Sequence, residues 1–161
     1  MNDADKEKLI ERYETTLEPV RTLVSDLSAG ALSFVPDLAD AWSVNEHLVH
    51  ILEADQLGWY RFRAAIAEPG TPSPVWNQET WRSRLRYSAL DGRTCLEEAV
   101  RVRGLIGATC RTVISDDWSE YFILHPQKGR MDLTQLLELY CGHADFHIPY
   151  IKRNLTAFGK R

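Results

Sequence analysis

The chain has 161 residues with a formal net charge of −4, and 44% of its residues are hydrophobic. This length fits a single domain, residues 1–161, whose core is large enough to fold without disulfides or a structural metal. The acidic balance argues against a nucleic-acid partner, and the lack of a long apolar stretch argues against a membrane protein. A polar N-terminus without signal-peptide features and three scattered cysteines predict a cytoplasmic location.

The first predicted helix extends from about residue 9 to residue 27. Its apolar residues recur at steps of three and four, as on the buried face of an amphipathic helix. They are Leu9, Tyr13, Leu17, Val20, Val24 and Leu27. Pro19 lacks a backbone N–H, so we expect it to bend this helix, which ends near Ala29 and Gly30.

The second predicted helix opens at Ser43 and stops before Pro69 and Gly70. Ser43 and Glu46 match a capping box, in which each side chain binds a backbone amide that the first helical turn leaves free. Residues 69–75 include three prolines and indicate an irregular connection.

An aromatic and basic run at residues 76–87 follows and favours a short helix. One interpretation of its arginines, Arg82, Arg84 and Arg86, is that they attract an anionic substrate. The other is that the run forms a solvated helix whose aromatic side chains pack inward. The pattern leaves both interpretations open.

Two further long helices complete the chain. Apolar residues follow a helical period from Leu96 to Ile114. A long connection over residues 115–131 leads to the last helix, which begins near Asp132 and stops at Gly159. Four long helices with two long connections predict an all-α four-helix bundle.

Two histidines stand one turn apart in the last helix. His143 and His147 occupy positions i and i+4 on the stripe that faces the bundle interior. An imidazole from a neighbouring helix, such as His50, could complete a three-nitrogen site that leaves coordination positions of a divalent metal open. The histidine pair alone fits hydrogen-bonded core residues equally well. Ala144 stands where HExxH has its glutamate, which excludes a zincin-type metalloprotease.

Three separate stretches resemble the DinB/YfiT-like superfamily. Residues 41–50, AWSVNEHLVH, followed by Asp55, resemble that family's second-helix signature, in which a histidine lies eight residues after the tryptophan. Residues 136–151, LLELYCGHADFHIPYI, resemble its C-terminal signature, in which two histidines four apart lie between a tyrosine and an isoleucine. Residues 125–129, HPQKG, are similar to the loop before the last helix in the YfiT-like branch.

The resemblance implies an up-down-down-up four-helix bundle that binds a divalent nickel or zinc ion. Carried over by position, the metal ligands are His50, His143 and His147. Relatives in this superfamily include metal-dependent hydrolases as well as transferases or isomerases that use a low-molecular-weight thiol. The resemblance therefore implies a small-molecule substrate, with the metal activating water or a thiol cosubstrate, and it assigns no catalytic residue.

Other polar residues near these histidines keep more than one interpretation. His47 lies three residues before His50 and could assist or replace it, or it could lie at the surface or pack through hydrogen bonds. Glu46 could orient His50, although its capping-box position explains it completely. His125 lies in a loop, which favours a turn or lid residue over a metal ligand.

Residues around the histidine pair carry further expectations. Pro149 should kink the last helix just after His147. Asp145 should face away from the site, by the helical period. Tyr140 and Tyr150 either line a cavity or pack in the core.

Two functional hypotheses remain. The first is a metal-dependent enzyme, either a hydrolase or a thiol S-transferase. The second is a non-catalytic helical bundle whose histidines only satisfy one another and nearby polar groups. Either protein could form a homodimer, and neither hypothesis involves nucleic acid or a membrane.

Overall fold

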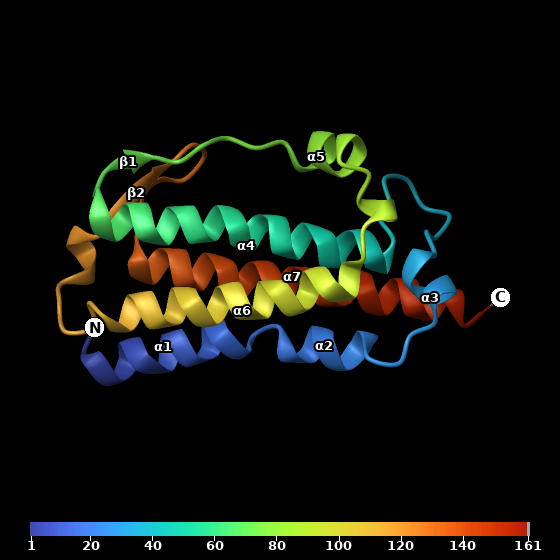
Figure 1. Ribbon diagram of the computed structural model, residues 1–161, viewed down its shortest axis with the longest axis horizontal. Helices are drawn as coiled ribbons and strands as arrows, with labels where there is room; N and C mark the ends of the chain where they lie inside the picture. Colours follow the sequence, from blue (N-terminus) through green and yellow to red (C-terminus); the bar gives the residue numbers. More distant parts are fainter. Residues whose placement is uncertain (161) are drawn as a thin grey trace.

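The computed structural model describes residues 1–160 and consists of four helical columns (Figure 1). The columns are α1 (Asp3–Thr15) with α2 (Glu18–Val24), α4 (Val44–Ala67), α6 (Gly92–Arg111) and α7 (Leu133–Phe158). The first and last columns run in one direction and α4 and α6 run in the other, which confirms the up-down-down-up order (Figure 1). Both α1 and α4 contact α6 and α7, so α1 and α4 lie diagonally opposite each other.

The first column is broken, although the sequence pattern predicted one bent helix. α1 ends at Thr15, α2 starts at Glu18 with Pro19 in its first turn, and a short α3 (Ala29–Ser33) follows. Proline suits the start of a helix because the amides of the first turn have no partner within the helix. Pro19 therefore begins a new helix instead of bending a continuous one.

Side-chain caps determine where the site-bearing helices begin. Ser43 and Glu46 form the predicted capping box at the start of α4, and Asp132 begins a second one at the start of α7. α7 then continues through Pro149 and ends at the predicted cap, Gly159. The caps thereby fix the positions at which α4 and α7 present their histidines.

A small three-stranded sheet, which the sequence did not predict, lies at one end of the bundle (Figure 1). β1 (Thr71–Pro72) pairs in parallel with β2 (Phe122–His125), and β2 forms an antiparallel hairpin with β3 (Gly129–Asp132). Gly129 adopts a φ of +71° at the hairpin turn, a conformation that costs glycine little because it has no Cβ. The connection into β2 includes a short 3-10 helix, η2 (Trp118–Glu120).

The segment from Thr71 to Arg84 passes over α4, from the sheet at one end to α5 (Gln78–Arg84) near the other (Figure 1). We call residues 71–84 the crossing segment. α5 is the short helix predicted for this region, and a 3-10 helix, η1 (Tyr87–Ala89), connects it to α6. Three side chains of the crossing segment, Ser73, Trp76 and Arg82, contact residues of α4.

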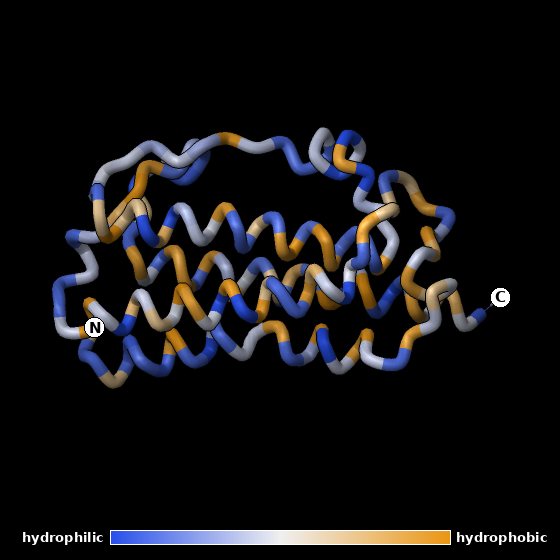
Figure 2. The backbone as a smooth tube through the Cα atoms, in the orientation of Figure 1, coloured by the Kyte–Doolittle hydropathy of each residue, from blue (hydrophilic) through white to orange (hydrophobic). Residues whose placement is uncertain are grey.

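A polar layer divides the apolar core into two clusters. On α4, Leu48 and Ile51 belong to one cluster, Phe62 belongs to the other, and the fully buried Asp55 lies between them. Figure 2 shows apolar and hydrophilic residues alternating along the long helices, as amphipathic helices require. None of the helices within residues 1–160 has the length and apolarity needed to cross a bilayer.

Candidate metal centre

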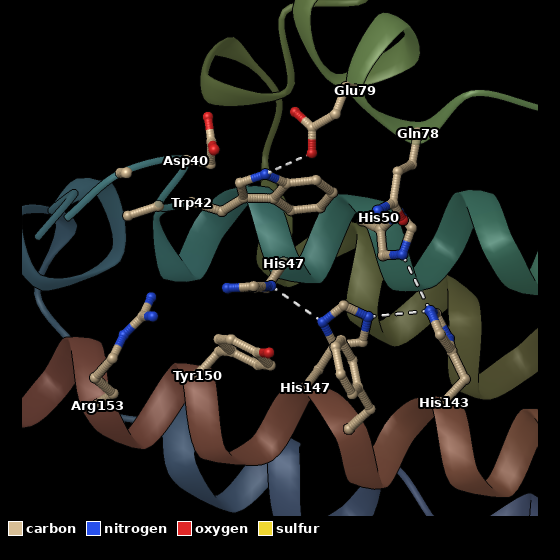
Figure 3. Close-up of a pocket in the computed structure, with 13 residues that line it drawn as sticks. Asp40, Trp42, His47, His50, Gln78, Glu79, His143, His147, Tyr150 and Arg153 are labelled. Carbon is tan, nitrogen blue, oxygen red and sulfur yellow. Dashed lines mark hydrogen bonds between the residues drawn. The ribbon is translucent and has the colours of Figure 1, made fainter.

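Three histidines from two helices, α4 and α7, point toward one another (Figure 3). His50 lies on α4, and His143 and His147 lie one turn apart on α7. Their candidate ligand nitrogens all lie within 4.8 Å of one another. Nε2 of His143 is 3.0 Å from Nε2 of His50 and 3.0 Å from Nε2 of His147. The fold therefore brings together the three side chains that the sequence singled out.

The hydrogen-bonding capacity of these rings fits a bound cation better than a closed network. An imidazole nitrogen carries either one hydrogen or one lone pair, so Nε2 of His143 cannot bond fully to both neighbours. Nδ1 of His50 and Nδ1 of His143 are buried and have no hydrogen-bond partner among residues 1–160. A divalent ion accepts three nitrogen lone pairs at once, and imidazole is a common ligand of zinc and nickel. The donor set therefore fits a divalent metal.

Burial keeps the histidines uncharged at neutral pH. It lowers the pKa of His50 to about 3 and the pKa of His147 to about 4, because desolvation penalises the charged imidazolium. Burial also lowers the pKa of His143 well below its ordinary value, and the neighbouring His147 and His50 lower it further. A neutral ring retains the lone pair with which it binds a metal.

These pKa values predict that the metal-free protein loses stability as the pH falls below about 6.5. An unfolded chain protonates its histidines near that pH, whereas folded His50 and His147 stay neutral until about 3 and about 4. Folding therefore excludes protons in this window, and stability falls with falling pH. Each of these two histidines should lower the free energy of unfolding by about 2 kcal/mol as the pH falls from about 7.5 to about 5. Urea unfolding with a chelator present measures the difference, and equal stability at the two pH values would contradict it.

His47 supports the site without joining the three converging nitrogens. Its side chain is 6% exposed, and its Nδ1 lies 3.0 Å from Nδ1 of His147, on the opposite side of that ring from Nε2 (Figure 3). If Nε2 of His147 binds a metal, Nδ1 carries the hydrogen and donates it to His47. The partner is His147 and not His50, so of the interpretations left open by the sequence the structure favours hydrogen-bonded packing.

Replacing His47 with alanine should weaken metal binding by about 10- to 100-fold without abolishing it, since loss of such a supporting partner has costs of that order. Competition with a chelating dye measures the change in affinity. The matched control is His125→Ala, since His125 lies outside the group of converging histidines. An unchanged affinity in the His47 variant would show that this contact does not orient His147.

Two other open interpretations are resolved nearby. Glu46 accepts hydrogen bonds from the backbone and side chain of Ser43 and pairs with Arg82 at 3.0 Å, so it acts as a cap and makes no hydrogen bond to His50. Nδ1 of His125 accepts backbone N–H bonds from the turn that follows it. His125 is therefore a turn residue.

The remaining residues of α7 fall on both sides of the site. Asp145 points outward, as expected, and pairs with Arg12 at 3.4 Å. Tyr140 is buried, and its hydroxyl accepts a hydrogen bond of 3.1 Å from Nη1 of Arg61. Tyr150 lines a cavity next to the histidines (Figure 3).

That cavity has a volume of about 280 Å³, close to the lower end of the roughly 300–1,000 Å³ found for small-molecule sites. Trp42 contributes to its wall, with its ring centroid 5.1 Å from that of His50. Trp76 stacks on His50 with centroids 5.3 Å apart and an angle of 2° between the planes. The stacking of Trp76 could not be inferred from spacing, because it depends on the path of the crossing segment.

A fully buried ion pair lies in the polar layer and connects the helices around the site. Arg103 of α6 donates to both carboxylate oxygens of Asp55 on α4, at 2.7 and 3.0 Å. It also donates to the backbone oxygen of Tyr140, one turn before His143 on α7. Both side chains are 0% exposed. This pair thus links the helix that carries His50 to the helix that carries the other two histidines.

Comparisons with known proteins agree with this architecture. The DinB superfamily model matches residues 12–151. A Bacillus licheniformis protein named "Putative metal-dependent hydrolase" is 21% identical over 158 residues, which cover 98% of this chain and 89% of that protein. The solved structure of YfiT from Bacillus subtilis, described as a probable metal-dependent hydrolase with an unusual four-helix bundle topology, matches with a TM-score of 0.86 and 20% identity over 99% of this chain and 90% of its own. Since the family model matches most of the chain, the protein belongs to the DinB superfamily.

Proposed function

We propose that this protein is a metal-dependent hydrolase that acts on a small molecule and holds a nickel or zinc ion through His50, His143 and His147. The observation that carries the proposal is the convergence of three imidazole nitrogens within 4.8 Å, beside a cavity of about 280 Å³. The names of the similar proteins support the same reaction class.

His50, His143 and His147 would hold a divalent ion with open positions, which would supply Lewis-acid chemistry and a bound water that ionises near neutral pH. The contribution of the protein is orientation and exclusion of water. Trp42 and Trp76 pack against His50 from two directions, edge-on and stacked, which restricts rotation of its ring. His47 fixes the orientation of His147 through the 3.0 Å contact between their Nδ1 atoms.

The proposal is tested by metal content and by hydrolysis in the same preparation. Purified without a histidine tag, the protein should retain stoichiometric divalent metal and hydrolyse activated esters of small acids. A chelator should stop the reaction, and added zinc or nickel should restore it.

A parallel assay with a low-molecular-weight thiol and an electrophile distinguishes a thiol S-transferase from a hydrolase. Formation of the thiol conjugate without ester hydrolysis would replace hydrolase by thiol S-transferase. A protein that takes up no divalent ion would instead support the non-catalytic bundle.

A further inference from the structure

A second cavity, of about 230 Å³, is lined in part by two of the three candidate metal ligands, His50 and His143. It lies between α4, α7, the crossing segment and the β2–β3 hairpin, all of which contribute to its lining. The charged and titratable side chains on its wall, apart from these two histidines, are Arg61, His125, Lys128 and Tyr140. No carboxylate is among the residues that line it. The cavity is therefore cationic in character.

Arg61 is the most unusual residue of this cavity. It is 6% exposed, yet no carboxylate of residues 1–160 lies within ion-pair distance of it. Its Nε donates to Ser73 Oγ at 2.8 Å and its Nη1 donates to Tyr140 Oη at 3.1 Å, whereas Nη2 makes no hydrogen bond within the described chain. A buried guanidinium is costly without a counterion. An anion from outside the chain would supply one.

Two other arginines in or near the polar interior, Arg103 and Arg82, contrast with Arg61. Arg103 is neutralised by Asp55. Arg82 belongs to the basic run for which an anion-binding role was one interpretation. It forms ion pairs with Glu46 and Glu79. Among these three arginines, Arg61 alone combines burial with a free donor at a cavity.

His125 and Lys128 line the same cavity and add two further hydrogen-bond donors to that of Arg61. Nδ1 of His125 accepts two backbone N–H groups, so the hydrogen of its neutral ring resides on Nε2. Arg61 and Lys128 also lie near enough to lower the pKa of His125, after the larger effect of burial. The wall thus offers hydrogen-bond donors from three side chains.

The position of Arg61 relates this cavity to the candidate metal centre. Its partner Tyr140 precedes His143 by three residues on α7, which corresponds to a rise of about 4.5 Å along the helix. We infer that the second cavity binds a carboxylate of the substrate at Arg61, with the reacting group of the same molecule at the metal. This inference rests on the proposed metal-dependent function and adds the chemical class of its substrate.

A matched pair of thiols tests the inference by binding, independently of turnover. In the cobalt-loaded protein, 3-mercaptobenzoate and 3-mercaptobenzamide each place sulfur on the metal and differ in the charge of the second group. The meta arrangement prevents that group from binding the same ion. The thiolate-to-cobalt absorption band measures both affinities.

We expect the wild type to bind the carboxylate at least about 10-fold more tightly than the amide, which corresponds to one charge-assisted hydrogen bond. Arg61→Met should remove this preference, and Arg61→Lys should retain part of it because the charge remains. Arg63→Met is the control, since Arg63 lies on the same helix, is exposed and packs on Trp59.

Equal binding of the two thiols by the wild type would overturn the inference and leave the metal centre intact. A preference that persists in Arg61→Met would also overturn it, because the carboxylate would then be recognised elsewhere. Failure to bind cobalt at all would overturn the proposed function itself, and with it the inference. Circular dichroism of each variant establishes that the comparison is made between folded proteins.

Discussion

Replacing His143 with alanine is expected to abolish divalent-metal binding while the bundle stays folded. Nε2 of His143 is the central nitrogen of the group, 3.0 Å from Nε2 of both His50 and His147. Its removal leaves two separated donors, so the loss of affinity should exceed the roughly 10- to 100-fold cost of losing a merely supporting contact. Mass spectrometric metal analysis after dialysis measures binding, and far-ultraviolet circular dichroism measures helix content.

The matched control for this variant is His125→Ala, in which a histidine outside the converging group is removed. The control should keep its metal and its helices. Full metal occupancy in the His143 variant would contradict the assignment of the site. If the alanine variant unfolds, His143→Gln tests the same prediction, because glutamine has a similar side-chain volume but lacks the imidazole.

The second large effect is expected from the buried ion pair. Asp55→Leu removes the carboxylate from a site that is 0% exposed and leaves the Arg103 guanidinium buried without its partner. Breaking a buried pair in this way costs about 3–5 kcal/mol. Urea unfolding monitored by circular dichroism should show a lower free energy of unfolding by that amount, with the metal removed so that its binding does not mask the change.

Two further variants serve as controls for the stability change in Asp55→Leu. The double variant Asp55→Leu with Arg103→Met should recover much of the lost stability, because no unpaired charge remains in the core. Asp145→Asn disrupts the exposed pair with Arg12 and should change stability by less than about 1 kcal/mol. If Asp55→Leu were no more destabilising than Asp145→Asn, the pair would not be a main connection between the helices.

The helices that carry the histidines were predictable because local chemistry determines them. The predicted Ser43–Glu46 capping box starts α4, and α7 begins directly after Asp132, where the sequence placed the start of the last helix. The i, i+4 spacing of His143 and His147 then places both rings on one face. Combined with the resemblance to a known family, these local signals were enough to indicate which residues would meet.

Other features depend on contacts between distant segments and left no comparable signal. The sheet consists of strands of two to four residues, too short for a clear alternating pattern. Arg61 has its partners Ser73 and Tyr140 at separations of 12 and 79 residues. Pro19 was recognised, but a proline can bend a helix or begin one, and only the packing of α2 decides between them.

The most direct test of the account is anomalous diffraction from crystals of the protein loaded with zinc or nickel. We predict one ion bound to Nε2 of His50, His143 and His147, at distances of about 2.0–2.1 Å for zinc. An ion bound elsewhere, or no ion between these three rings after loading, would contradict the central claim.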